Sequence, residues 1–285
     1  MSVPDAQAYR QPQPMATTPQ RQPFLNVALI PHDIIPGDTA ANLAAVEHTL
    51  NTLTPGLDLV VLPEMFNTGF TLNPTLLADT AETDNGPTIT TVKRWAAHHG
   101  FAIWGGFTQR TPAGGYANRG FMVSPDSTAQ FYNKRHLFSM SGEGTLLTPG
   151  HTPSPIVNLK GWRLAMSICY DIRFPVWNRN VDLAYDALIV PANWAHARVF
   201  AWKHMLIARA VENQAYVVGC NRSGSDDYGD YPADDSFAFN HWGDDIARRT
   251  PSGIIYCTFD SERLNRDRYR FSPWRDADSF TLLPD

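Results

Sequence analysis

The sequence predicts an α/β protein, because short apolar runs alternate with helix-like stretches from Phe24 onward. Several of these runs are continuously apolar, such as the one at 59–62, which is the pattern of strands covered on both faces. No Gly/Ser-rich linker or change in composition interrupts the alternation. We therefore expect one domain, over residues 23–285.

The chain begins with a segment, 1–22, that is rich in Gln and Pro. It lacks the basic start and the continuous apolar core of a signal peptide, so we interpret it as a disordered tail whose role the sequence does not indicate. Strands are predicted after it, in chain order, at 24–30, 57–62, 101–107, 118–123, 162–168, 187–190, 215–219 and 254–259.

Three helices are predicted between the strands. In 38–53, leucine and valine recur at spacings of three and four, and 87–99 begins with Pro87 and ends before Gly100, so both are expected to bury one face. The stretch 200–213 is apolar over much of its circumference. Because a surface helix needs only one apolar stripe, this helix either is deeply buried or meets another subunit, and the sequence leaves both readings open.

The composition excludes several classes of protein. A 43% hydrophobic and 18% charged chain with a net charge of −5 is ordinary for a soluble protein and offers no basic footprint for nucleic acid or an anionic membrane. No apolar run is long enough to cross a bilayer. The 3 cysteines lie far apart, so reduced thiols of a cytoplasmic protein are expected rather than disulfides or a zinc site. We expect no metal ion and no cofactor.

Three segments share one form, in which an apolar strand runs into a reactive polar residue and then into a turn. They deliver the carboxylate of Glu64, the ammonium of Lys134 and the thiol of Cys169. Since α/β folds present functional groups at the carboxyl ends of strands, the three side chains are candidates for one site.

Cys169 has an ordinary interpretation as a small buried core residue, which is the one we give to Cys220 and Cys257. The residues after Cys169 favour a nucleophile, because 170–175 resembles a turn into a helix with Pro175 in its first turn. At a helix N-terminus the pKa of a thiol falls below its usual value of about 8.5. The same turn would leave the backbone N–H of Tyr170 free to bind an oxyanion.

Glu64 and Lys134, taken alone, are most simply solvated surface residues. An amidase that uses a thiol, however, needs a base that takes the thiol proton and returns it to the leaving ammonia. It also needs positive charge where the tetrahedral oxyanion forms. A carboxylate and an ammonium are the residue types for these two tasks.

The three segments together resemble the nitrilase superfamily of carbon-nitrogen hydrolases. They read Leu-Pro-Glu-Met-Phe at 62–66, Asn-Lys-Arg-His-Leu-Phe at 133–138 and Cys-Tyr-Asp-Ile-Arg-Phe-Pro at 169–175. Their order and separation also agree with that superfamily, from about Phe24 to the end of the chain. Within it the sequence is most similar to the omega-amidases, for example at Pro-Ala-Asn-Trp, 191–194.

The resemblance implies a four-layered α-β-β-α sandwich that pairs through helices into homodimers or larger assemblies. It implies Cys169 as nucleophile, Glu64 as general base and then acid, and Lys134 as the oxyanion stabiliser beside the Tyr170 amide. A second glutamate of the family, which orients the lysine and the substrate, matches Glu143.

The substrate implied for an omega-amidase is a short dicarboxylate monoamide such as α-ketoglutaramate. The residues expected to contact it are Phe66, Tyr170, Arg173, Asn193 and Trp194. A substrate carboxylate needs a cation or amide donors, and the nearby candidates are Arg173, Arg198 and His196.

The sequence departs from the omega-amidases at two pocket positions. Gly144 and Leu147 stand where that branch carries a histidine and an aromatic residue, and Ala195 replaces its proline after Asn-Trp. We therefore expect a larger and less discriminating cavity. Two alternatives remain open, namely another amidase of the superfamily, for deaminated glutathione or carbamoyl amino acids, and a catalytically silent binding protein on the same fold.

Overall fold

The computed structural model describes residues 21–282. Most of the predicted disordered tail, 1–22, therefore lies outside the described residues. Its last two residues are held by the domain, which corrects the boundary of that prediction. Gln22 pairs through its backbone N–H with the Lys160 carbonyl at 3.1 Å, and its carbonyl accepts from Trp162 Nε1 at 3.1 Å.

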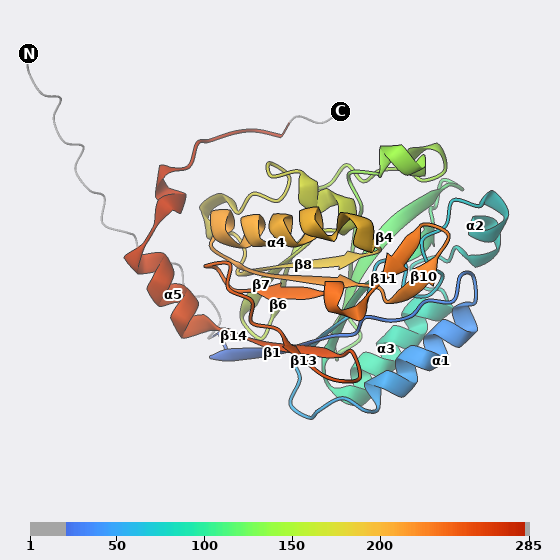
Figure 1. Cartoon of the computed structure of the whole chain (residues 1–285), viewed down its shortest axis with the longest axis horizontal. Helices are drawn as coiled ribbons and strands as arrows, with labels where there is room; N and C mark the ends of the chain where they lie inside the picture. The colour runs from blue at the N-terminus through green and yellow to red at the C-terminus, as the bar shows by residue number, and fades with distance from the viewer. Residues whose placement is uncertain (1–20, 283–285) are drawn as a thin grey trace, which may run out of the picture.

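The larger of two main sheets has seven strands and contains both parallel and antiparallel pairs (Figure 1). Strands β1, β2 and β3 are parallel, whereas β14 and β4 flank them antiparallel. In spatial order the strands are β13 (Arg248–Arg249), β14 (Ile255–Asp260), β1 (Phe24–Leu29), β2 (Leu59–Val61), β3 (Ala102–Arg110), β4 (Tyr116–Val123) and β5 (Ala129–Asn133).

The second sheet has five strands, of which β7, β8 and β9 are parallel. In spatial order they are β12 (Phe237–Phe239), β9 (Tyr216–Asn221), β8 (Ala187–Ala192), β7 (Trp162–Met166) and β6 (Ile156–Leu159). A separate hairpin consists of β10 (Gly224–Asp226) and β11 (Gly229–Tyr231).

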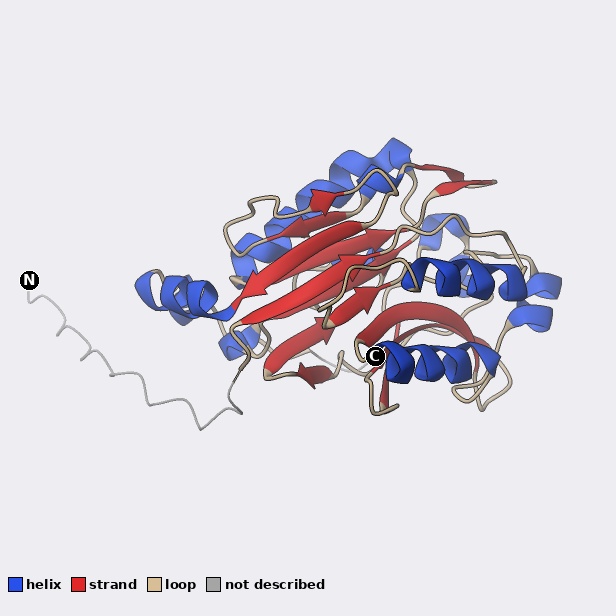
Figure 2. Cartoon of the chain, turned by 90° about the horizontal axis from the view of Figure 1, so that it is seen from below, coloured by secondary structure: helices blue, strands red, loops and turns tan. Residues whose placement is uncertain are grey.

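Helices cover the outer faces of the two sheets, as Figures 1 and 2 show. The α-helices are α1 (Thr39–Leu50), α2 (Pro74–Thr80), α3 (Pro87–His99), α4 (Val199–Asn213) and α5 (Ser261–Arg270). Short 3-10 helices are η1 (Ser139–Ser141), η2 (Glu143–Thr145), η3 (Cys169–Arg173), η4 (Val181–Leu183), η5 (His196–Arg198), η6 (Ala233–Asp235) and η7 (Pro273–Asp276). Within residues 21–282, none of the helices has the length and apolarity needed to cross a lipid bilayer.

The period of two along the strands divides the core into two parts. On β2, Leu59 and Val61 face the five-stranded sheet, whereas Val60 faces α1 and α3. Both faces of this strand are therefore covered, as its continuously apolar sequence predicted. The layers are thus α1 with α3, the seven-stranded sheet, the five-stranded sheet, and α4, which is the predicted α-β-β-α sandwich.

The first described residue and the last α-helix meet at one buried carboxylate. Asp186 accepts from Arg163 of β7 and from Arg268 of α5, each at 2.8 Å, and Arg21 lies 3.0 Å away. We call these four residues the Asp186 cluster. No sequence pattern indicated it, and α5 itself was missed.

The predicted strands and helices correspond to elements of the structure, with ends that differ by a few residues. Helix α4 buries Trp202 and Leu206 on one side, while Phe200 on the other side is 75% exposed. The helix expected after Cys169 was wrong. Only the five-residue η3 forms there, and Phe174 is extended, because the residue before a proline is disfavoured in the α region.

Candidate active site

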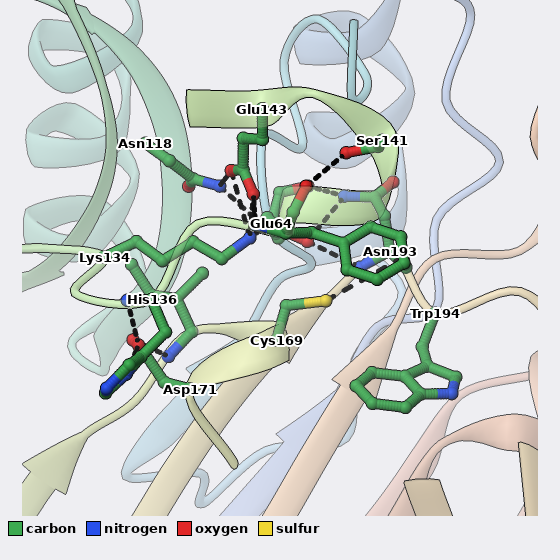
Figure 3. A network of polar contacts seen from close by, with 12 residues as sticks. Glu64, Asn118, Lys134, His136, Ser141, Glu143, Cys169, Asp171, Asn193 and Trp194 are labelled. Carbon is green, nitrogen blue, oxygen red and sulfur yellow. Dashed lines mark hydrogen bonds and ion pairs between the residues drawn. The ribbon is translucent and has the colours of Figure 1, made fainter. Parts of the chain in front are cut away.

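Glu64, Lys134 and Cys169 come together at one end of the gap between the two sheets (Figure 3). Each follows the carboxyl end of a strand, namely β2, β5 and β7. Because β2 and β7 belong to different sheets, the packing of the sheets, and not one sheet edge alone, creates the site. The structure thus places together the three side chains that the sequence singled out.

The Lys134 ammonium is the centre of a buried ionic cluster. Its Nζ lies 3.0 Å from Glu64 Oε1 and 3.0 Å from both carboxylate oxygens of Glu143. The side chains are 1% exposed for Lys134 and Glu64 and 0% for Glu143. Glu143 also accepts from the Phe138 N–H at 2.6 Å, so it fixes the loop above the lysine as well as the lysine itself.

Asn118 of β4 is a member of this cluster that the sequence did not reveal. Its Nδ2 donates to Glu64 Oε1 at 2.6 Å and to Glu143 Oε1 at 3.0 Å. We call Lys134, Glu64, Glu143 and Asn118 the Lys134 cluster. Nothing in the local sequence of β4 distinguishes Asn118, and only the pairing of β4 with β5 brings it beside Lys134.

Asn193, which was expected to bind substrate, also holds Glu64 in place. Its backbone N–H donates to Glu64 Oε2 at 2.8 Å, and its Nδ2 donates to the Glu64 carbonyl at 2.6 Å. The glutamate is therefore held by donors from both sheets, with one carboxylate oxygen directed to Lys134 and the other to Asn193.

The charges of the cluster follow from its contacts. Burial alone would raise the pKa of Glu64, but the charge of Lys134 and hydrogen bonds from Lys134, Asn118 and Asn193 hold it below its usual value of 4.5. Burial alone would lower the pKa of Lys134, but the carboxylates of Glu143 and Glu64 raise it well above its usual value. At neutral pH the ammonium and the Glu64 carboxylate are both ionised.

Cys169 is a thiol at rest, in contrast to the thiolate that we expected. Burial and the Glu64 carboxylate raise the pKa of Cys169 well above its usual value, in spite of the charge of Lys134. The side chain is 7% exposed, and its Sγ lies 3.9 Å from the Asn193 carbonyl. Its backbone is left-handed, with φ of 45°, which is a strained conformation for a residue with a side chain.

Asp171 connects the turn of Cys169 to the strand end that carries Lys134. Its carboxylate accepts from Tyr132 Oη at 2.8 Å and from the His136 N–H at 2.8 Å, and it is fully buried. The two segments are therefore fixed relative to each other.

A cavity lies directly against Cys169, Glu64 and Lys134. Of the five residues expected to bind substrate, the structure places Tyr170, Arg173, Asn193 and Trp194 in its wall. Arg198, a candidate for binding the substrate carboxylate, also lines the cavity. The remaining lining residues, which the sequence did not indicate, are Phe70, Phe138, Ser141, Tyr228 and Tyr231. Six of the lining side chains are aromatic, so the walls are largely apolar with polar tips.

Phe66 does not line the cavity, which corrects our expectation. It is fully buried and packs edge-on against Phe121, with ring centroids 6.0 Å apart. Neither Gly144 nor Leu147 lines the cavity, and Leu147 packs in a separate apolar cluster. The prediction that these two positions enlarge the cavity remains a prediction.

Two cations in the cavity wall lack an acidic partner. Within residues 21–282, no carboxylate pairs with Arg173 or Arg198. The Arg173 guanidinium lies over the Trp194 ring at 5.2 Å, and that of Arg198 lies over Phe138 at 5.6 Å. His196 instead pairs with a carboxylate of η6 and does not line the cavity. The two arginines are therefore available to an anionic ligand.

Comparisons with known proteins give the family model that this chain matches and its relatives. The family model for carbon-nitrogen hydrolases matches residues 26–269. Omega-amidase YafV of Yersinia enterocolitica is 38% identical over 263 residues, which cover 91% of this chain and 99% of that protein. The 2-oxoglutaramate amidase of Bacillus subtilis is 30% identical over 237 residues, or 82% of this chain and 90% of that protein.

Solved structures of related proteins have the same fold as this chain. A CN-hydrolase superfamily protein from Xanthomonas campestris, with an arsenic adduct in its active site, superposes with a TM-score of 0.85 at 34% identity and covers 91% of this chain and 99% of that one. Saccharomyces cerevisiae Nit3, a member of the nitrilase superfamily, has a TM-score of 0.77 at 24% identity and covers 88% and 96%. These matches confirm the four-layered fold.

Proposed function

Because the chain belongs to the carbon-nitrogen hydrolase family and is 38% identical to an omega-amidase, we propose that it is an omega-amidase. In this proposal it hydrolyses the terminal amide of short dicarboxylate monoamides such as α-ketoglutaramate. The relatives named as an omega-amidase and a 2-oxoglutaramate amidase support the substrate class. The observation that carries the proposal is a thiol beside an ionised glutamate and a buried lysine, in a cavity with two arginines that pair with no carboxylate of residues 21–282.

The first half of the reaction forms a thioester. Glu64 takes the proton of the Cys169 thiol as Sγ attacks the amide carbon, so no free thiolate is needed before substrate binds. The negative oxygen that develops is stabilised by the Lys134 ammonium and by the Tyr170 N–H, which has no acceptor among residues 21–282. Glu64 then gives its proton to the leaving nitrogen, and ammonia departs.

The second half hydrolyses the thioester. A water molecule occupies the place of the ammonia, and Glu64 takes its proton as the oxygen attacks the thioester carbon. Collapse of the second tetrahedral intermediate releases the carboxylic acid, Glu64 returns its proton to the Cys169 sulfur, and the acid then loses its own proton to water. Throughout both halves Glu143 keeps Lys134 charged and directed at the reacting oxygen.

Substrate choice depends on the far end of the molecule. Arg173 and Arg198 supply planar guanidinium groups that suit a carboxylate, and aromatic side chains pack on the short carbon chain between them and Cys169. A second candidate, an amidase for carbamoyl amino acids, would use the same catalytic residues.

The test is the release of ammonia across a panel of amides, with kcat/KM compared for α-ketoglutaramate, glutamine, succinamate and a carbamoyl amino acid. We expect α-ketoglutaramate to be preferred. Arg173→Gln and Arg198→Gln should lower kcat/KM for this substrate far more than for butyramide, a control that has no carboxylate. A preference for the carbamoyl compound would reject the omega-amidase proposal and leave the thioester mechanism in place.

We also propose that the protein forms a homodimer or a larger homo-oligomer through the outer face of α4. Phe200 is 75% exposed and Val211 is 46% exposed on this face, opposite the buried Trp202. Light scattering at micromolar concentration should show an oligomer, and Phe200→Glu should dissociate it. A monomer for the unaltered protein would end this proposal.

We place the enzyme in a reducing compartment, the cytoplasm. Cys169, Cys220 and Cys257 are all free, and a thiol nucleophile must remain reduced to act. Fractionation of cells and detection of the protein in each fraction would test this location.

A further inference from the structure

Asn118 donates a hydrogen bond to Glu64 and does not line the cavity. We propose that Asn118 is a positioning residue that keeps Glu64 ionised, so that Glu64 can accept the thiol proton. The inference rests on the proposed function, because it assumes that Glu64 is the base.

Asn118 contacts the other three members of the Lys134 cluster, as Figure 3 shows for its side chain. Its Nδ2 donates to Glu64 Oε1 at 2.6 Å and to Glu143 Oε1 at 3.0 Å. Its backbone carbonyl accepts from the Lys134 N–H at 2.9 Å. The residue is fully buried, so water does not share these tasks.

The charge of the cluster explains why an amide is needed at this position. Two carboxylates share one ammonium in a region with almost no solvent, so one negative charge remains uncompensated. Such a pair of carboxylates tends to take up a proton, which would relieve the repulsion between them. An uncharged NH₂ group has two hydrogens, one for each carboxylate, and its hydrogen bond to Glu64 favours the ionised form of that side chain.

The orientation of the Asn118 amide follows from the same chemistry. Ionised carboxylates only accept hydrogen bonds, so the NH₂ end, and not the oxygen, must face Glu64 and Glu143. The opposite end, Oδ1, has no hydrogen-bond donor within residues 21–282 although it is buried. An unsatisfied buried oxygen lowers stability, so the role of Asn118 at this position lies in the two N–H donors at the other end of its amide.

An ionised Glu64 matters because the thiol cannot ionise by itself. The pKa of Cys169 is raised, so the nucleophile forms only when Glu64 takes its proton. If the hydrogen bond from Asn118 is lost, the pKa of Glu64 rises, because burial is then opposed by fewer donors. A protonated Glu64 is inactive as a base, and the acid limb of the pH-rate profile must move to higher pH.

The experiment compares Asn118→Leu, Asn118→Ser and Asn118→Asp with a matched control, Asn240→Leu. Asn240 is 1% exposed and also donates to a carboxylate, Asp244 Oδ2 at 2.9 Å, but it lies outside the cavity wall. Two readouts are followed against pH, namely kcat/KM for amide hydrolysis and the rate at which iodoacetamide alkylates Cys169. The second readout needs no natural substrate.

We expect Asn118→Leu to shift the acid limb upward by about one pH unit in both readouts and to lower kcat by about tenfold or more. Asn118→Ser, which keeps one donor, should fall between Leu and the unaltered protein. Asn118→Asp should show the largest loss, since it adds a third carboxylate. The control should change thermal stability without moving the acid limb.

An unshifted acid limb in a folded Asn118→Leu or Asn118→Ser protein would overturn the inference and leave Asn118 with a packing role only. If no amide in the panel is hydrolysed, the proposed function fails. The alkylation profiles still decide the role of Asn118 in that case, because they depend only on the Cys169 and Glu64 pair.

Discussion

The Lys134 cluster and the Asp186 cluster both bury ionised side chains, but they differ in whether a neighbouring group can transfer a proton to the carboxylate. In the Asp186 cluster one carboxylate is surrounded by three arginines, whose protons stay in place at neutral pH. In the Lys134 cluster two carboxylates surround one lysine, and a thiol with a raised pKa lies beside them. Only the second cluster borders the cavity.

The comparison shows that a shifted pKa does not by itself identify a catalytic group. Burial would raise the pKa of Asp186, but Arg163, Arg21 and Arg268 lower it, so its shift has the same direction as that of Glu64. What distinguishes Glu64 is a neighbour that can give it a proton, Cys169, and open space for a substrate. Asp186 has neither and holds the structure together.

Replacing Cys169 should have the largest effect on activity. Cys169→Ala removes the nucleophile and exchanges a sulfur for a hydrogen at a cavity wall, so packing changes little. We expect hydrolysis to be abolished, as measured by ammonia release, with the thermal unfolding transition nearly unchanged. Residual hydrolysis above a trace would assign the nucleophile elsewhere.

Glu64→Gln and Lys134→Ala should each lower kcat by roughly 10²- to 10⁴-fold. Because both residues serve one transition state, the double variant should be little worse than the poorer single variant. Steady-state kinetics of the three proteins tests this prediction. Losses that multiply would mean that the two residues act independently.

Asp186→Asn should have the opposite profile, since it leaves the buried Arg268 and the partly buried Arg21 and Arg163 without their shared counter-charge. We expect the free energy of unfolding to fall by about 3 kcal/mol, with kcat per folded molecule close to that of the unaltered protein. Urea unfolding and activity assays on the same preparation measure both quantities. A loss of kcat without a loss of stability would remove the distinction between the two clusters.

The stability of the protein should also depend on pH through Asp186. Its pKa is lowered in the folded state, so its contribution is fully present above the unfolded value of about 3.9 and is lost as pH falls through the folded value. Asp186→Asn should therefore flatten the acid side of the stability profile. Unfolding followed by circular dichroism from pH 6 to pH 3 would show an unchanged slope if another carboxylate dominates.

The smallest expected effect is a difference in the rate at which the three cysteines are alkylated. Cys169 should react with iodoacetamide before Cys220 and Cys257, because it lines the cavity next to a base. Burial raises the pKa of Cys220 and Cys257, and neither of them lines the cavity. Peptide mass mapping after brief treatment measures the order, and equal labelling would contradict it.

The sequence predicted those parts of the site that lie at the ends of apolar strands. Glu64, Lys134 and Cys169 could be found because each comes directly after such a run in a recognisable motif. Asn118 could not, because its contacts depend on the register of β4 with β5 and on the packing of the two sheets. A hydrogen bond between strands distant in sequence leaves no local pattern.

The state of the Cys169 thiol was mispredicted for a similar reason. The sequence suggested a helix after Cys169, but Pro175 keeps Phe174 extended and ends the helix after five residues. A short 3-10 turn has little dipole to offer a thiolate. Burial, followed by the charge of Glu64 from the other sheet, raises the pKa of Cys169, and neither cause is visible in the local sequence.

The Asp186 cluster has a consequence for the order of folding. It joins Arg21, just before the first strand, to Arg268 in the last helix, so it closes a loop that contains nearly the whole chain. Contacts between distant parts of a chain carry the greatest cost in loop-closure entropy and are expected to form after the sheets. Asp186→Asn should then accelerate unfolding and leave the refolding rate almost unchanged. In that case the contacts of this carboxylate form after the folding transition state and determine the lifetime of the folded enzyme.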